Sequence, residues 1–223
     1  MHPNTAFRRA PQQAALDLAR RRGFGILSIN GPDGPLLAHV PFLLDAGGGT
    51  LDLHLVRSNP VLRALPAPAV LAVSGPDGYV SPDWYGIADQ VPTWNYVAVH
   101  LRGHLDALPQ TAMRDMLDRQ SASFERRLAG KPPWMPAKMT PDVLDRMLRQ
   151  IVPCRLAVTA IDSTYKLGQN KPDAVRARAA AAIADGFGQD LDDLARLMRE
   201  PPSDTPPSGT PHPHPQPKSE PSA

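Results

Sequence analysis

Alternating apolar and polar residues predict strands in the first third of the chain. In 50–56, Leu51, Leu53 and Leu55 alternate with Asp52 and His54, which is the period of two typical of a half-buried strand. Two earlier strands are predicted on either side of a Gly-Pro-Asp-Gly-Pro turn, and they form a hairpin. The predicted strands cover 25–30, 36–44, 50–56, 69–74, 96–108 and 151–161.

Helical spacing appears in other segments. Residues 12–22 place Ala15, Leu18 and Ala19 on one face, and Gly23 is expected to end this helix. A Gly-Pro-Asp-Gly string at 75–78 predicts a second sharp turn, after the strand at 69–74. Further helices are predicted over 61–65, over 109–150 with an interruption at 130–136, over 174–185 and over 191–199.

This order of elements predicts an α+β fold. Six or so strands with hairpin connections favour an antiparallel barrel with peripheral helices packed on its outside. A doubly wound sheet is disfavoured, because the chain has neither a Gly-x-Gly-x-x-Gly string after a strand nor a phosphate loop. We expect one domain over 1–200, and a disordered Pro-rich tail over 201–223, where apolar residues almost disappear.

Composition narrows the function classes. The chain has 223 residues, 42% of them hydrophobic, which is enough for one core, and a formal charge of +2 gives little support to DNA binding. The single cysteine, Cys154, excludes an intrachain disulfide and lies in an apolar run, and the scattered histidines argue against a metal site. No apolar run approaches the roughly 20 residues of a membrane span. We expect a cytoplasmic protein with no membrane partner.

Aromatic residues concentrate in one segment. Three of the four Tyr and two of the three Trp lie in 79–96, beside Ser, Thr and Asn. This crowding favours a flat, partly polar surface that meets a planar partner or a second subunit. Ordinary packing of aromatic residues in a sheet is the alternative.

Two polar clusters interrupt the apolar pattern. Arg57, Ser58 and Asn59 offer a cation, a hydroxyl and an amide where a strand meets a helix, which suits a phosphate group. Alternatively, Ser58 or Asn59 caps the helix and Arg57 is solvated. The cluster Lys166-Leu167-Gly168-Gln169-Asn170-Lys171 supplies donors for carbonyl, ring-nitrogen or phosphate acceptors, or is an ordinary loop.

His39 lies in the middle of a predicted strand and is followed by Val40 and Pro41. Because proline cannot donate to the sheet, this position indicates a strand edge or a bulge open to a ligand. We find no nucleophile elbow, catalytic triad or paired carboxylates. No catalytic residue is therefore assigned, and any chemistry belongs to a cofactor.

Taken in order, five blocks resemble the PaiB-type FMN-binding negative transcriptional regulators. The similarity covers nearly all of 1–199 and does not reach the tail. His2-Pro3 stands where the family more often has Tyr-x-Pro, so the family's N-terminal contact does not transfer. The blocks are Ala38-His39-Val40-Pro41-Phe42-Leu43-Leu44, His54-Leu55-Val56-Arg57-Ser58-Asn59-Pro60, 75–85, Val91-Pro92-Thr93-Trp94-Asn95-Tyr96 and 166–171.

The resemblance implies a split β-barrel related to the pyridoxamine-phosphate-oxidase-like flavoproteins, which form homodimers with FMN in a groove shared by both subunits. It implies that Arg57, Ser58 and Asn59 hold the FMN phosphate. The strand around His39, Val40 and Pro41 would run along the isoalloxazine ring. The remaining residues that would close the site, from the same or the other subunit, are Trp94, Asn95, Tyr96, Lys166, Gln169 and Asn170.

Three functions are compatible with this reading, because fold alone does not decide function. The first is a flavin-binding regulator, the second a flavin-dependent oxidoreductase acting on a small molecule, and the third a dimeric scaffold without its cofactor. The helices at 174–199 could be mistaken for a helix-turn-helix. Their arginines are offset by Asp185, Asp190, Asp192 and Asp193, so direct DNA contact has little support.

Overall fold

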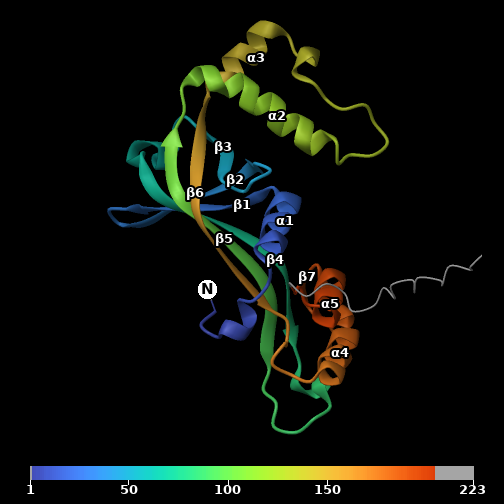
Figure 1. Ribbon diagram of the computed structural model, residues 1–223. Coiled ribbons are helices and arrows are strands. Elements are labelled where there is room, and N and C mark those ends of the chain that lie inside the picture. The colour runs from blue at the N-terminus through green and yellow to red at the C-terminus, as the bar shows by residue number, and fades with distance from the viewer. Residues whose placement is uncertain (1, 204–223) are drawn as a thin grey trace, which may run out of the picture.

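Six antiparallel strands close into a barrel in the computed structural model, which describes residues 2–203 (Figure 1). The strands pair in the order β1-β2-β3-β6-β5-β4, and a second pairing of β1 with β4 closes the ring. The α+β split-barrel prediction is confirmed, while almost all of the predicted tail lies outside the described residues. The strands are β1 Phe24–Gly31, β2 Gly34–Leu44, β3 Thr50–Val56, β4 Ala67–Val80, β5 Thr93–Ala107, β6 Ile151–Lys166 and the short β7 Gly188–Gln189.

Three strands are much longer than the others. The strands β4, β5 and β6 have 14, 15 and 16 residues, and in Figure 1 they run past the barrel toward the C-terminal helices. Each long pairing contains a register shift, one of them at Arg102 and Gly103 of β5. A Cβ on Gly103 would lie 1.9 Å from the carbonyl oxygen of Ala157, so this bend of the sheet requires glycine.

The turn predicted at 75–78 is wrong, because these residues lie inside β4. The strand slips register between Ser74 and Asp77 instead of reversing. A Cβ on Gly75 would come within 2.8 Å of Val97 Cβ, and one on Gly78 within 3.0 Å of Leu191 Cδ2. The two glycines therefore allow close packing of other elements on a continuous strand.

The core fills the barrel and the space under the first helix. Leu51, Leu53 and Leu55 are all buried, so the strand and its apolar face are confirmed, while Asp52 on the opposite face is buried too. Helix α1 (Gln12–Arg22) packs Ala15, Leu18 and Ala19 onto the barrel, and it ends where predicted, at Gly23 with φ +58°. The Cys154 thiol is buried, and that burial raises its pKa to about 12, which makes it a poor nucleophile.

The other helices cover the two ends of the long strands (Figure 1). Helices α2 (Met113–Glu125) and α3 (Pro141–Leu148) lie at one end, and α4 (Asp173–Ala182) and α5 (Leu191–Arg199) lie at the other. Strand β6 is longer than predicted and ends at Lys166. No helix within 2–203 is long and apolar enough to cross a membrane. The short helices are Thr5–Phe7, Pro60–Ala64, Pro82–Tyr85, Gln110–Ala112, Pro136–Lys138 and Ile183–Asp185.

Candidate functional site

A pocket of about 280 Å³ lies between β2 and β3, and we call it the β2–β3 pocket. It brings together four of the predicted site residues: His39, Val40, Pro41 and Asn59. Its wall is completed by apolar side chains, among them Val56 and Ile151, and by the ring of His54. Exposed apolar residues lie near it, since Val56 is 58% exposed. The pocket thus offers an apolar surface with two imidazoles.

The predicted phosphate cluster lies beside this pocket, and its members have different tasks. Asn59 caps the short helix at 60–64, with its side chain accepting a hydrogen bond of 3.0 Å from the Val61 amide. The Arg57 guanidinium is exposed and donates to the carbonyl oxygen of Arg149 (2.8 Å) and to Gln110 Oε1 (2.6 Å). These partners are neutral, and no carboxylate within residues 2–203 pairs with Arg57, so its charge is fixed in place but not compensated.

His54 is held by a hydrogen-bond chain from helix α2. Gln120 donates from Nε2 to the backbone oxygen of Asp52 (3.1 Å), which leaves its Oε1 to face His54 Nδ1 at 3.1 Å. Because Oε1 only accepts, Nδ1 must carry the proton and Nε2 is left as an acceptor. Burial lowers the pKa of His54, partly offset by the Gln120 hydrogen bond, so the ring is neutral at pH 7.

An ion-pair network anchors the same strand. The carboxylate of Asp52 is only 5% exposed and accepts two hydrogen bonds from Arg155, of 2.6 and 2.9 Å, and one of 2.8 Å from Arg119. Burial raises the pKa of Asp52, but the hydrogen bonds and charges of the two arginines outweigh it and hold the pKa below its usual value. Helix α2 is therefore fixed to β3 behind the β2–β3 pocket.

A second cavity, of about 200 Å³, lies at the far end of β5 and β6, and we call it the lysine cleft. It contains three of the predicted site residues, Asn95, Lys166 and Asn170. Lys171 and Tyr85 also line it, and the Lys171 ammonium lies 4.2 Å from the centre of the Tyr85 ring. Partial burial lowers the pKa of Lys166.

The predicted trio Trp94, Asn95 and Tyr96 is divided between two faces of β5. Asn95 is buried on the face of the lysine cleft, and Trp94, 44% exposed, points to the opposite face, as the alternation of a strand requires. There Trp94 meets Phe187 edge to face at 5.6 Å, and Tyr79 stacks on Phe187 at 5.2 Å. Tyr96 follows Trp94 on that face of the strand. The aromatic surface predicted over 79–96 is therefore present only in part: Trp94 is exposed beside Phe187, Tyr79 is half-buried next to them, and Tyr85 is buried.

Gln169 is committed to its own loop. Its Oε1 accepts from the Leu167 amide at 2.8 Å, and its Nε2 donates to the backbone oxygen of Tyr165 at 2.5 Å. The side chain therefore shapes the turn after β6, which places Asn170 and Lys171 at the cleft.

The two cavities lie at opposite ends of one strand. Ile151, the first residue of β6, lines the β2–β3 pocket, and Lys166, the last, lines the lysine cleft. They are 15 residues apart (166 − 151), which corresponds to roughly 45–50 Å along a strand at about 3.3 Å per residue. A group held by Arg57, which adjoins the Ile151 end, is therefore far from Lys166 of the same chain.

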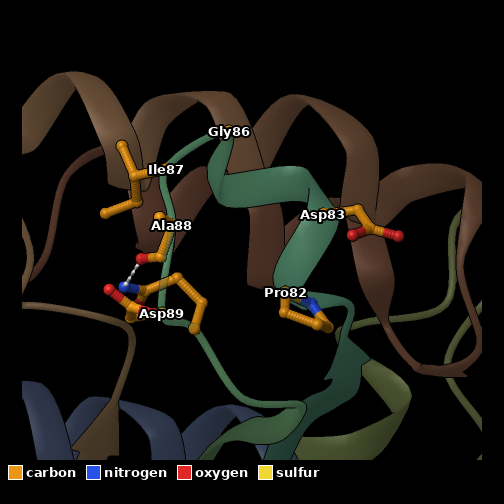
Figure 2. Close-up of a pocket in the computed structure, with 7 residues that line it drawn as sticks. Pro82, Asp83, Gly86, Ile87, Ala88 and Asp89 are labelled. Carbon is orange, nitrogen blue, oxygen red and sulfur yellow. Dashed lines mark hydrogen bonds between the residues drawn. The ribbon is translucent and has the colours of Figure 1, made fainter.

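A third hollow follows the short helix at 82–85 (Figure 2). Figure 2 shows Asp83 and Asp89 on opposite sides of it, and a hydrogen bond of 2.9 Å from Gln90 to the Ala88 oxygen closes the loop. Its carboxylates do not converge. No group of three or more His, Cys, Asp or Glu side chains within residues 2–203 could hold a metal ion.

The predicted site residues did not include His54, Tyr85 and Lys171, which line these cavities, or Gln120, which contacts His54 from α2. His54, Tyr85 and Lys171 stand inside the sequence blocks that carry the family resemblance, so the signal was present. Gln120 lies on a helix with no motif around it, and only its contact with β3 reveals it.

Comparison with known proteins decides the family. The model of the "Putative FMN-binding domain" matches residues 1–160. The chain belongs to this family. A curated relative, "Protease synthase and sporulation protein PAI 2" of Bacillus subtilis, is 24% identical over 188 residues, which is 82% of this chain and 89% of the relative. The PaiB-type resemblance is confirmed, and family membership identifies FMN as the cofactor.

Solved structures support the fold. The FAD and heme binding protein of Mycobacterium smegmatis superposes with a TM-score of 0.54 at 20% identity, over 82% of each chain. The flavocytochrome Anf3 of Azotobacter vinelandii gives a TM-score of 0.54 at 13% identity, over 98% of this chain and 92% of its own. At such identities the likeness concerns the barrel alone.

The residues present fit FMN. The β2–β3 pocket presents apolar side chains and two imidazoles to a planar ring, and Arg57 beside it carries a charge that no described carboxylate neutralises. A flavin phosphate matches that charge, and a guanidinium already oriented by neutral partners loses little freedom on binding it.

Proposed function

We propose that the protein is an FMN-binding homodimer of the PaiB-type regulators, with each flavin held between two chains. The observation that carries this proposal is the spacing along β6. The predicted phosphate residue Arg57 adjoins the Ile151 end of β6, and Lys166 is the last residue of that strand, roughly 45–50 Å away when measured along the strand in one chain. A second chain could bring them together. The aromatic cluster of Tyr79, Trp94 and Phe187, in which Trp94 and Phe187 are exposed, supports such an interface.

In this arrangement one chain supplies the phosphate and ring contacts. Arg57, Ser58 and Asn59 hold the phosphate, and the β2 segment His39, Val40 and Pro41 lies along the ring. The other chain closes the site with residues of β5 and of the loop after β6, namely Trp94, Asn95, Tyr96, Lys166, Gln169 and Asn170. Bound FMN supplies reversible uptake of electrons, and the protein binds, orients and shields it.

The regulatory part of the proposal rests on the likeness to the PAI 2 protein rather than on a DNA-binding surface. The arginines of α4 and α5 are used inside the chain. Arg178 donates to the backbone oxygens of Tyr85 and Gly86, Arg199 to that of Ala180, and Arg196 pairs with Asp193. These helices are therefore poorly suited to read a DNA groove, and regulation would act through a flavin-dependent change or through a protein partner.

The first test is the visible absorbance of the purified protein with and without FMN, together with its mass in solution. A dimer that binds one FMN per chain supports the proposal. A monomer that binds FMN stoichiometrically would contradict the two-chain site, and a dimer indifferent to FMN would leave the scaffold reading. Labelled promoter DNA, titrated at several salt concentrations, tests direct repression, which absence of binding at low salt would exclude.

A flavin-dependent oxidoreductase is the second candidate. The observation in its favour is the lysine cleft, whose two ammonium groups have only neutral partners among the described residues if the flavin phosphate lies at Arg57. This reading requires that bound FMN is reduced by NADH or NADPH under anaerobic conditions and reoxidised by an acceptor. Bleaching at 450 nm measures it, and a flavin that stays oxidised with both donors would contradict it.

A further inference from the structure

The lysine cleft carries two positive charges and no negative one. Lys166 and Lys171 both line it, and no carboxylate is among the side chains that line it. The nearby Asp83 and Asp89 line the neighbouring hollow instead. Two like charges in a partly buried cavity repel each other more strongly than in water, so the cleft is electrostatically suited to an anion.

The partners that the two ammonium groups have are neutral. Lys166 donates to the hydroxyl of Thr93, and Lys171 donates to the side-chain oxygen of Gln90 while lying over the Tyr85 ring. None of these contacts compensates a charge. They orient both ammonium groups and leave each of them free donor capacity, because an ammonium has three N–H groups.

A second observation points to the same place. Tyr85, which lines the cleft, is 1% exposed, and its hydroxyl has no hydrogen-bond partner within residues 2–203. A buried hydroxyl without a partner costs about 1–3 kcal/mol, so this residue of the cleft lining has an unused donor and acceptor. Asn170 adds a further amide to the lining.

We propose that the lysine cleft binds the oxyanion group, carboxylate or phosphate, of a small-molecule ligand, with Lys166 and Lys171 as the charged contacts. At about 200 Å³ the cleft accommodates such a group and little more. The β2–β3 pocket, with Arg57 beside it, serves the cofactor. The claim that this ligand meets the flavin rests on the proposed function. The claim that the cleft binds an oxyanion does not.

The test is calorimetric titration of the full-length protein with inorganic phosphate and, separately, with succinate, in a low-salt buffer free of both. We expect saturable binding of at least one anion, weakened about tenfold or more in Lys166→Met, as loss of a charge-assisted contact implies. Lys138→Met is the matched control, because Lys138 is exposed and lies outside the cleft, and it should bind like the wild type. The tighter probe assigns the ligand class. Thermal melting checks that both variants are folded.

Three results would overturn the proposal. The first is no saturable binding of either anion up to about 10 mM, and the second is equal binding by the wild type and Lys166→Met. The third is loss of anion binding after the protein is loaded with FMN, because the cleft would then hold the cofactor's own phosphate. FMN binding is followed separately at 450 nm. A protein that binds phosphate but not FMN would therefore refute the proposed function and support the anion site. A protein that binds FMN but neither anion would support flavin binding and refute the anion site.

Discussion

The β2–β3 pocket and the lysine cleft differ in how their polar groups are supported. In the first, Arg57 donates to the Arg149 carbonyl oxygen, Asn59 accepts from the Val61 amide, and His54 donates to Gln120. In the cleft, two lysines have only neutral partners and the Tyr85 hydroxyl has none among the described residues. The polar groups of the first region are held by partners within the chain, whereas those of the second keep unused hydrogen-bonding capacity. Removing support should therefore damage the pocket, whereas removing groups from the cleft should cost little stability.

The largest effect is expected from Asp52→Ala. It leaves Arg155 and Arg119 without their shared carboxylate and should lower the free energy of unfolding by about 2–3 kcal/mol, somewhat less than for a fully buried pair because both arginines keep contact with water. Urea unfolding measures it. Asp118→Ala, which removes an exposed ion pair with Arg114, is the control and should change stability by less than about 1 kcal/mol. Equal losses would show that the network does not anchor α2.

The double substitution of Arg57 and Ser58 by Ala should weaken FMN binding about tenfold or more without unfolding the protein, because one charge-assisted contact is worth about 1.5–3 kcal/mol. Fluorescence titration of FMN measures the affinity. Arg63→Ala is the matched control, since Arg63 is an exposed cation on the adjacent short helix and does not line the pocket. Unchanged affinity in the double variant would remove both residues from the phosphate site.

Acid should destabilise the protein below about pH 6.5. Burial lowers the pKa values of His54 and His100, so the unfolded chain takes up these protons first as the pH falls. The two histidines contribute fully to the free energy of unfolding above the pKa of histidine in the unfolded chain, about 6.5, and this contribution is lost as the pH falls below that value. The loss should be less than about 1.4 kcal/mol per pH unit for each ring, because both rings keep some contact with solvent. Urea unfolding from pH 7.5 to 5 should show a smaller slope for His54→Gln and an unchanged slope for the exposed control His104→Gln. A parallel profile for His54→Gln would be evidence against its burial in neutral form.

The smallest effect is expected from Tyr85→Phe in the ligand-free protein. Because the hydroxyl is buried without a described partner, its removal should leave stability unchanged or raise it by up to about 1 kcal/mol. Thermal melting compares it with Tyr79→Phe, whose ring lies in the aromatic cluster. A loss above about 1 kcal/mol would mean that the hydroxyl has a partner in the free protein.

Most of the barrel could be predicted because its signals are local. Leu51, Leu53 and Leu55 set the period of a strand, and Gly23 ends α1 in the left-handed conformation. The string at 75–78 misled the prediction because glycine and proline mark turns in general, whereas here the glycines make room for Val97 and Leu191. That need arises from other parts of the chain, and no local pattern encodes it.

The candidate site was predictable as a set of residues but not as a geometry. Asn95 and Trp94 are neighbours in sequence, yet the strand sends them to opposite faces. Arg57 and Lys166 were expected at one cofactor, and the length of β6 separates them within a chain. Spacing in sequence does not show which of two faces or two ends a residue occupies, so only the fold shows which of these residues lie together.

The length of β6 has a genetic consequence. In the proposed two-fold pair, each flavin draws Arg57 from one chain and Lys166 from the other, so the pair holds two equivalent sites. A chain altered at Arg57 and a chain altered at Lys166 would then complement each other when they are expressed together. Such a mixed pair would contain one intact site and one site lacking both groups, and half of the flavin capacity would return although neither parent is competent.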